Sequence, residues 1–352
     1  MDIQRTLVSH APSRRRPQVV LRRLLDTVPE HATGAELVAE LERRVAELLG
    51  KPRALLFPTG TMTQQVALRV HAERTGRRSF LAHPTNHLEL WEKHGYADVH
   101  GLRFQPVGEP HSLLTLDDLT GATIEPAAAL LLELPQREIG GPLPTWDDLV
   151  AQVDWAHAHG AATHLDGARL WEAQPFYGRP HAEIAALFDT AYVSLYKGLG
   201  GISGGMLAGP AEVIDAAVVW RRRLGGDLPD PWPFALAGLA GLDERVTRMA
   251  DYRDHAVAIA SALSAAGIAE VYPDPPCTAM FHLSLPVAAA DLDRANQDIM
   301  AERGLQVISR AQPRHPGRCT VEVTVSENAM EFTPDEVVAL YRELLERAAG
   351  QS

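Results

Sequence analysis

Apolar residues recur at helical spacing in the segment that follows residue 33. Thr33 followed three residues later by Glu36 has the pattern of a capping box, and Gly50 marks a stop. One face of the intervening segment carries Leu37, Leu41, Val45 and Leu48. The spacing therefore predicts an amphipathic helix over about 34–49.

Short continuous apolar runs follow, separated by helical patterns. The runs at 54–57, 128–132, 161–165 and 191–195 predict strands, and the segments 61–73 and 146–159 predict helices. Apolar strands that alternate with helices are typical of a parallel sheet covered on both faces. We expect an α/β fold with a mostly parallel sheet.

The pattern changes from about residue 243 onwards. Longer helices appear, with alternating strands predicted near 280–285 and 320–325, and a capped amphipathic helix begins at Thr333. This predicts a large α/β domain over 50–240 and a smaller α+β domain formed by residues 1–49 and 241–352.

Composition narrows the classes of function. The chain of 352 residues has a formal net charge of −12, which argues against a nucleic-acid partner. No apolar run approaches the roughly 20 residues that cross a bilayer, so we expect no membrane partner. Arg14, Arg15 and Arg16 are not followed by the apolar stretch of a signal peptide, and a transit peptide is the less favoured interpretation. We expect a cytoplasmic protein.

Cysteine and histidine give no metal site. Cys277 and Cys319 are the only cysteines, which indicates neither a disulfide framework nor a Cys-rich zinc site. Among the 15 histidines, His157 and His159 lie two apart on a predicted helix and do not share a face. We expect no metal.

Lysine is rare in this chain. It occurs at Lys51, Lys93 and Lys197, and arginine supplies the rest of the 33 positive charges. Lys197 ends an apolar strand and begins a glycine-rich loop. Withdrawal from water disfavours a charged amine, which then becomes available as a nucleophile, a role that guanidinium cannot take. The alternative is a phosphate-contacting or exposed lysine.

Two other motifs lie at predicted strand ends, where open α/β sheets bind ligands. The run Pro58-Thr59-Gly60-Thr61 joins a strand to a helix, whose N-terminus can bind a phosphate, although these are also ordinary capping residues. In the segment 164–169, Asp166 could hold a protonated pyridine nitrogen and Arg169 a substrate carboxylate, or the two could pair and fix the loop.

Together these residues resemble the threonine aldolase and aromatic amino acid β-eliminating lyase family of fold-type I enzymes dependent on pyridoxal 5′-phosphate (PLP). The resemblance covers about 35–345. It rests on the phosphate-binding turn at 57–62, an unchanged H-x-D-G-A-R segment at 164–169, K-G-L-G at 197–200, and an H-x-x-x-x-E element formed by His87 and Glu92.

The resemblance implies a role for each matching residue. Lys197 would carry PLP as a Schiff base, Asp166 would pair with the ring nitrogen, and His87 would stack on the ring. Thr59, Gly60 and Thr61 would hold the phosphate, and Arg169 would bind the α-carboxylate of an amino-acid substrate. Family members are homo-oligomers, so a homodimer or homotetramer is implied.

Departures from the family pattern concern the substrate. Gln136 stands where the family has a histidine that acts on the substrate hydroxyl, and an amide cannot serve as a base. Glu322 replaces a carboxylate-binding arginine, and Tyr196 replaces the serine before the lysine.

We therefore expect a lyase that resembles L-threonine aldolase and has Gln136 in its substrate site. His87 or a water would take the hydroxyl proton. The alternatives are β-elimination, racemisation or transaldol chemistry on another amino acid, and a PLP-binding protein without activity.

Overall fold

The computed structural model describes residues 3–350 and divides into two compact units. The larger unit comprises residues 26–139 and 143–246. The smaller unit holds the chain up to residue 25, residues 140–142 and the chain from residue 247. Each unit is described by itself.

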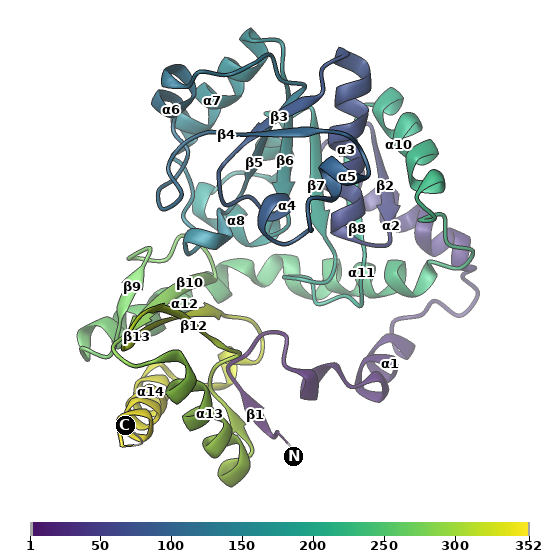
Figure 1. The fold of residues 1–352 in the computed structure, drawn as a ribbon. Helices are drawn as coiled ribbons and strands as arrows, with labels where there is room; N and C mark the ends of the chain where they lie inside the picture. The colour runs from purple at the N-terminus through teal and green to yellow at the C-terminus, as the bar shows by residue number, and fades with distance from the viewer. Residues whose placement is uncertain (1–2, 351–352) are drawn as a thin grey trace. The chain divides into compact units, whose positions relative to one another are not determined.

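A seven-stranded sheet forms the centre of the larger unit (Figure 1). Its strands, in spatial order, are β2 (Arg53–Phe57), β8 (Gly205–Gly209), β7 (Thr190–Ser194), β6 (Ala162–Gly167), β5 (Ala129–Glu133), β3 (Ser79–Ala82) and β4 (Arg103–Pro106). The pairings from β7 through β4 are parallel, whereas β8 runs antiparallel to both its neighbours. The expected mostly parallel α/β fold is confirmed; the reversed strand β8 was not predicted.

Helices surround this sheet (Figure 1). They are α2 (Gly34–Leu48), α3 (Gly60–Thr75), α4 (His87–Leu90), α5 (Gly95–Asp98), α6 (Leu116–Gly121), α7 (Trp146–Ala158), α8 (Leu170–Tyr177), α9 (His181–Ala186), α10 (Ala211–Arg223) and α11 (Trp232–Arg245). The capping box predicted for α2 is present, because the Thr33 hydroxyl accepts from the Glu36 N–H and the Glu36 carboxylate accepts from the Thr33 N–H at 2.8 Å. The two side chains thus provide acceptors for two N–H groups that have no acceptor within the helix.

Helix α3 is buried on most of its circumference and orders one face of the sheet. Val66 and Val70 of α3 pack with Phe57 of β2, Leu207 of β8 and Ile214 of α10 in one apolar cluster. On the same helix Leu68 joins a second cluster under β3 and β5. Burial on several sides explains why α3 lacks the single apolar stripe of a surface helix.

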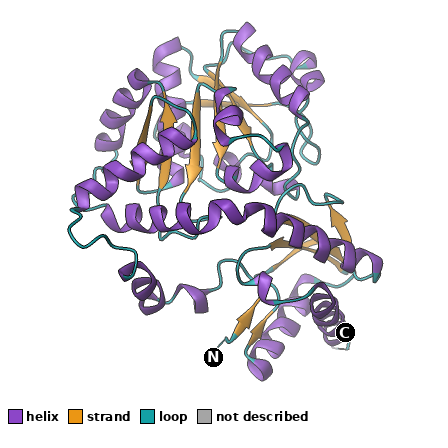
Figure 2. Cartoon of the chain, turned by 180° about the vertical axis from the view of Figure 1, so that it is seen from behind, coloured by secondary structure: helices purple, strands orange, loops and turns teal. Residues whose placement is uncertain are grey.

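The smaller unit combines an antiparallel sheet with helices. Its sheet has the order β12 (Ala311–His315), β13 (Arg318–Thr324), β10 (Met280–Leu285), β9 (Glu270–Tyr272), and β1 (Arg5–Thr6) pairs in parallel with β11 (Leu305–Gln306). Its helices are α1 (Pro17–Leu25), α12 (Met249–Ala265), α13 (Ala289–Arg303) and α14 (Pro334–Ala349), and Figure 2 shows this mixture of strand and helix. Glu322 lies on β13 opposite His282 of β10, with a carboxylate–imidazole distance of 4.0 Å.

The division between the units differs from the expected one at the N-terminal side. Residues 26–49, expected in the smaller domain, belong to the larger unit. The physical reason is the apolar face of α2, where Leu37, Leu41 and Val45 are buried. The later boundary lies after residue 246, close to the change of pattern at 243.

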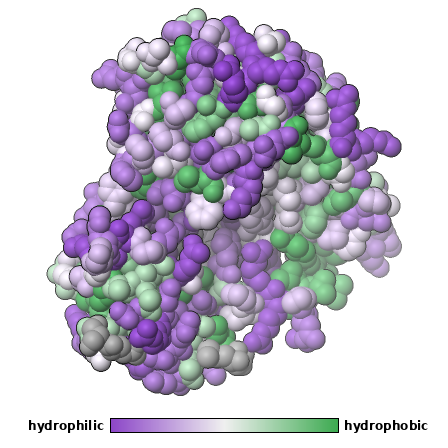
Figure 3. All heavy atoms as spheres, in the orientation of Figure 1, coloured by the Kyte–Doolittle hydropathy of each residue, from purple (hydrophilic) through white to green (hydrophobic). Residues whose placement is uncertain are grey.

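Within residues 3–350, no helix is long and apolar enough to cross a membrane. On the face drawn in Figure 3, hydrophilic side chains are interspersed with small hydrophobic patches.

Candidate active site

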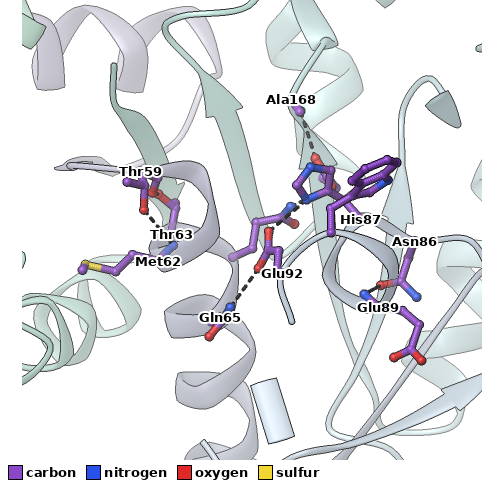
Figure 4. Close-up of polar contacts among 12 residues, drawn as sticks. Thr59, Met62, Thr63, Gln65, Asn86, His87, Glu89, Glu92 and Ala168 are labelled. Carbon is purple, nitrogen blue, oxygen red and sulfur yellow. Dashed lines mark hydrogen bonds and ion pairs between the residues drawn. The ribbon is translucent and has the colours of Figure 1, made fainter. Parts of the chain in front are cut away.

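The first part of the site is the N-terminus of α3. Thr59 is the N-cap, and its hydroxyl accepts a 3.2 Å hydrogen bond from the Met62 N–H (Figure 4). The Thr63 hydroxyl donates to the Thr59 carbonyl at 2.7 Å and fixes the same turn. The N–H groups of Gly60 and Thr61 lie in the first turn, where a helix provides no acceptor. They can therefore bind an anion, and the helix dipole favours one there.

Glycine is required at position 60 by its neighbour. A Cβ atom added to Gly60 would lie 2.0 Å from the hydroxyl oxygen of Tyr192, which projects from β7 and is almost fully buried. No side chain fits in that space. The tyrosine thus holds the helix N-terminus close against the sheet.

Asp166 lies near the end of β6 and is 1% exposed. Its Oδ2 atom accepts a 2.7 Å hydrogen bond from Gln64 Nε2 of α3, and its Oδ1 atom accepts a 3.0 Å bond from the Ala168 N–H. The two donors fix the orientation of this buried side chain. A carboxylate has about four acceptor positions, so Asp166 can still accept from a protonated ring nitrogen.

Gln64 contributes an acceptor beside Asp166. Its Oε1 atom is buried and has no hydrogen-bond partner among residues 3–350. A buried polar atom without a partner is costly and is commonly completed by a ligand or water. Together with Asp166 and the N-terminus of α3, this acceptor fits a phosphorylated pyridine.

Lys197 follows β7 and lies in a turn that Ser194 fixes. The Ser194 hydroxyl oxygen accepts 3.3 Å hydrogen bonds from the N–H groups of Tyr196 and Lys197. Burial lowers the pKa of the Lys197 amine, and the charge of Arg169 lowers it further, while the Asp166 carboxylate acts in the opposite direction. A lowered pKa increases the share of neutral amine, the form that can act as a nucleophile.

His87 is the first residue of α4, whose N-cap is Asn86 (Figure 4). Its Nδ1 atom lies 3.0 Å from Glu92 Oε1, and Glu92 Oε2 accepts a 2.8 Å hydrogen bond from Gln65 Nε2. The Glu92 side chain is 1% exposed, whereas the His87 side chain is 29% exposed. We assign the Nδ1 proton to the hydrogen bond with Glu92, which leaves Nε2 of the imidazole as the acceptor.

The two expected substrate residues lie in the same unit. Arg169 is buried at the start of α8, with its Nη1 atom 3.8 Å from Glu172 Oε1. Gln136 is buried after β5 and donates through Nε2 to Glu133 Oε2 at 3.1 Å and to Thr85 Oγ1 at 3.5 Å. The amide therefore acts as a donor here, in agreement with its inability to serve as a base.

The sequence did not point to three residues of this site, which are Glu133, Gln64 and Tyr192. Glu133 of β5 and Tyr192 of β7 are both register partners of Asp166 on β6, so these three side chains lie in a row on one face of the sheet. Gln64 approaches Asp166 from α3. The polar residue that ends the apolar run of β5 was a signal for Glu133. No local pattern marked Gln64 or Tyr192.

The described residues contain no group of three or more histidine, cysteine or acidic side chains that could hold a metal ion. The turn that holds Lys197 follows β7, the buried Asp166 lies on the neighbouring strand β6, and the N-terminus of α3 packs against Tyr192 of β7. This arrangement, with the mostly parallel sheet, is that of a fold-type I PLP-dependent enzyme.

Comparison with known proteins identifies the family. Residues 29–285 match the family model described as beta-eliminating lyase, and the chain belongs to this family. Its members are PLP-dependent lyases, and the chain is a PLP-dependent enzyme resembling threonine aldolase.

Individual relatives agree with the assignment to this family. The low specificity L-threonine aldolase of Escherichia coli (strain K12) is 32% identical over 235 residues, which cover 65% of this chain and 70% of that protein. A structure of a candidate L-allo-threonine aldolase from Listeria monocytogenes EGD-E has a TM-score of 0.90 at 34% identity, with 98% of this chain and 97% of that chain covered. A structure from Exiguobacterium sp. 255-15, a candidate aromatic amino acid beta-eliminating lyase/threonine aldolase, has a TM-score of 0.90 at 35% identity and covers 98% of both chains.

Proposed function

We propose that the protein cleaves a β-hydroxy-α-amino acid to glycine and an aldehyde, with PLP held on Lys197. The observation that carries the proposal is that Lys197, Asp166 and the His87–Glu92 pair belong to one unit. Gln64 and Gln65 of α3 donate hydrogen bonds to Asp166 and Glu92, and the charge of Asp166 acts on Lys197. Related proteins named as threonine aldolases support the reaction class.

Besides Lys197, five residues complete the cofactor site. Asp166 would accept from the ring nitrogen, the N–H groups of Gly60 and Thr61 would bind the phosphate, and the Thr59 cap holds their turn. The His87 ring would pack on the pyridine. When bound, PLP withdraws electrons from the substrate α-carbon.

His87 is the proposed base for the substrate hydroxyl. Glu92 orients the imidazole and stabilises its protonated form, as a carboxylate does in other histidine bases. Gln65 in turn fixes Glu92. Gln136 is a donor in this structure, and we propose that it contacts substrate as a hydrogen-bonding group.

Arg169 is the proposed partner of the α-carboxylate. A guanidinium group matches a carboxylate in two parallel hydrogen bonds. Glu172 lies beside it at 3.8 Å and would orient the guanidinium.

Incubation of the purified protein with a panel of β-hydroxy-α-amino acids, including L-threonine and L-allo-threonine, tests the proposal. We expect glycine and the matching aldehyde in equal amounts, and no product with Lys197→Ala. Release of ammonia and a keto acid instead would show β-elimination and contradict the proposed bond cleavage.

A homodimer or homotetramer in the cytoplasm is also proposed. Exposed apolar side chains on α1 support association, since Leu21 is 63% and Leu25 73% exposed. The low cysteine content supports a reducing compartment. Sedimentation of the purified protein tests the proposed oligomeric state, and a monomer at micromolar concentration would contradict it.

A further inference from the structure

Two carboxyl groups lie side by side at the end of the central sheet. Glu133 is the last residue of β5 and is the register partner of Asp166 on β6. Register partners on adjacent strands direct their side chains to the same face. Like charges on two register partners repel each other, so ionisation of one carboxyl group disfavours ionisation of the other.

The hydrogen bonds of the two groups differ in length. Asp166 accepts from Gln64 Nε2 at 2.7 Å and from the Ala168 N–H at 3.0 Å. Glu133 accepts from Gln136 Nε2 at 3.1 Å and from the Arg137 N–H at 3.3 Å. The bonds to Asp166 are the shorter ones, as in charge-assisted hydrogen bonds, whereas those to Glu133 are longer. In agreement, burial and the neighbouring Asp166 carboxylate raise the pKa of Glu133 to about 8.

Other charged groups around Glu133 oppose this effect but do not reverse it. The Lys197 amine and the Arg137 guanidinium both lower the pKa of Glu133. His83, from the segment after β3, lines the same small cavity as Glu133 and Gln136. Burial lowers the pKa of His83, which keeps its ring neutral near pH 7.

We propose that Glu133 is a proton-holding positioning residue, which stays neutral in the working site and thereby keeps the Lys197 amine available. This inference rests on the proposed function of Lys197. With Glu133 neutral, Asp166 is the anion acting on Lys197, against the cations Arg169 and Arg137. An ionised Glu133 would add a second anion and stabilise the charged, unreactive ammonium form.

Infrared spectroscopy of the cofactor-free full-length protein tests the proton directly. Above pH 6 ordinary carboxyl groups are ionised, so the carbonyl stretch of a protonated acid reports an unusual group. We expect this band at pH 7, with loss at a midpoint of about pH 8. It should be absent in Glu133→Gln and retained in Glu138→Gln, a matched control on the adjacent turn. No band in the unchanged protein, or a band that persists in Glu133→Gln, would overturn the inference.

The effect on Lys197 has a second readout, the rate at which cofactor-free protein captures added PLP, followed by absorbance. Glu133→Gln imitates the neutral acid, so the two proteins should agree near pH 7. At pH 9 the unchanged protein should be slower by roughly three- to tenfold, since its amine is then held charged. Coincident profiles across pH 6–10 would contradict the inference. Failure of both proteins to capture PLP would instead overturn the proposed function while leaving the infrared result intact.

Discussion

Gln64 Nε2 donates a 2.7 Å hydrogen bond to Asp166 Oδ2, although 102 residues separate the two in sequence. Gln64 lies on α3, whose first turn is the proposed phosphate site, and Asp166 lies on β6. Two turns further along α3, His71 Nε2 lies 2.8 Å from the Thr190 hydroxyl of β7. These contacts fix α3 relative to the sheet, so the phosphate site and the proposed ring-nitrogen partner keep a constant spacing.

Gln64→Leu is expected to weaken PLP binding. Loss of a donor to a buried carboxylate costs about 1–3 kcal/mol and leaves the proposed partner of the ring nitrogen less well held, so affinity should fall roughly tenfold. Equilibrium titration with PLP, followed by absorbance, measures this. Gln152→Leu is the matched control. Gln152 is a buried glutamine of α7 that donates to the Leu114 carbonyl, and its loss should affect stability but leave PLP affinity unchanged. Equal affinities for PLP in Gln64→Leu and the unchanged protein would disprove the role of Gln64.

Glu92→Gln separates catalysis from cofactor binding. The amide cannot stabilise a protonated His87, so kcat for retro-aldol cleavage should fall roughly 100-fold while the PLP content stays near that of the unchanged protein. His94→Gln serves as the control, because His94 is an exposed histidine close to the same loop. An unchanged kcat in Glu92→Gln would show that the His87–Glu92 pair does not act as the base.

Gly60→Ala is expected to disrupt the phosphate site. The new methyl group would overlap the Tyr192 hydroxyl, and a buried ring between strand and helix cannot move aside without shifting α3. We expect lower thermal stability and loss of PLP binding. At Gly121, on α6, an added Cβ meets no heavy atom of the described residues within 4 Å. Gly121→Ala should therefore bind PLP normally. Normal PLP binding by Gly60→Ala would contradict the packing described for Tyr192.

Stability is expected to fall below neutral pH because of histidines buried in a neutral form. Burial lowers the pKa of His71 to about 4 and that of His164 to about 3. Asp189 raises the pKa of His71, whereas Arg74 lowers it, and the two histidines repel each other's charge. The unfolded chain binds protons near pH 6.5 and the folded chain does not. This contribution is therefore complete above pH 6.5 and is lost progressively as pH falls to about 4 for His71 and to about 3 for His164.

Urea unfolding at pH 7.5 and pH 5.5 measures the effect as a change in the free energy of unfolding. His71→Gln removes one of the titrating groups, so its free energy should change less between the two pH values. Exposed His111→Gln should behave as the unchanged protein. If His71→Gln retained the full pH dependence, the loss of stability would have another source.

Local sequence patterns predicted much of the fold, because interactions between residues close in sequence determine those helices and strands. The Thr33 capping box, the apolar run at β5 and the change of pattern near residue 243 each reflect neighbours in sequence. The reversed direction of β8 could not be read in this way, since Gly205–Gly209 carries no signal of strand direction. The helix at 34–48 was expected in the smaller domain because its packing partners are distant in sequence.

In the candidate site, too, residues whose role depends on partners distant in sequence could not be predicted. Lys197 and Asp166 stood out by residue type and by position at strand ends. Gln64 and Glu133 acquire a role only through the strand register and the position of α3, which place both beside Asp166. Tyr192 reads as an ordinary β residue, and only the close approach to Gly60 reveals its function in holding the turn.

The most direct test of the central claim uses the three lysines of this chain. The protein is incubated with PLP, treated with borohydride to fix any imine, digested and analysed by mass spectrometry. Lys51 donates to the Phe188 carbonyl and Lys93 lies at the surface, so each is an internal control. We predict a phosphopyridoxyl group on Lys197 at near-complete occupancy and none on the other two. Labelling of Lys51 or Lys93 in its place, or no labelling at all, would contradict the assignment of Lys197 as the cofactor lysine.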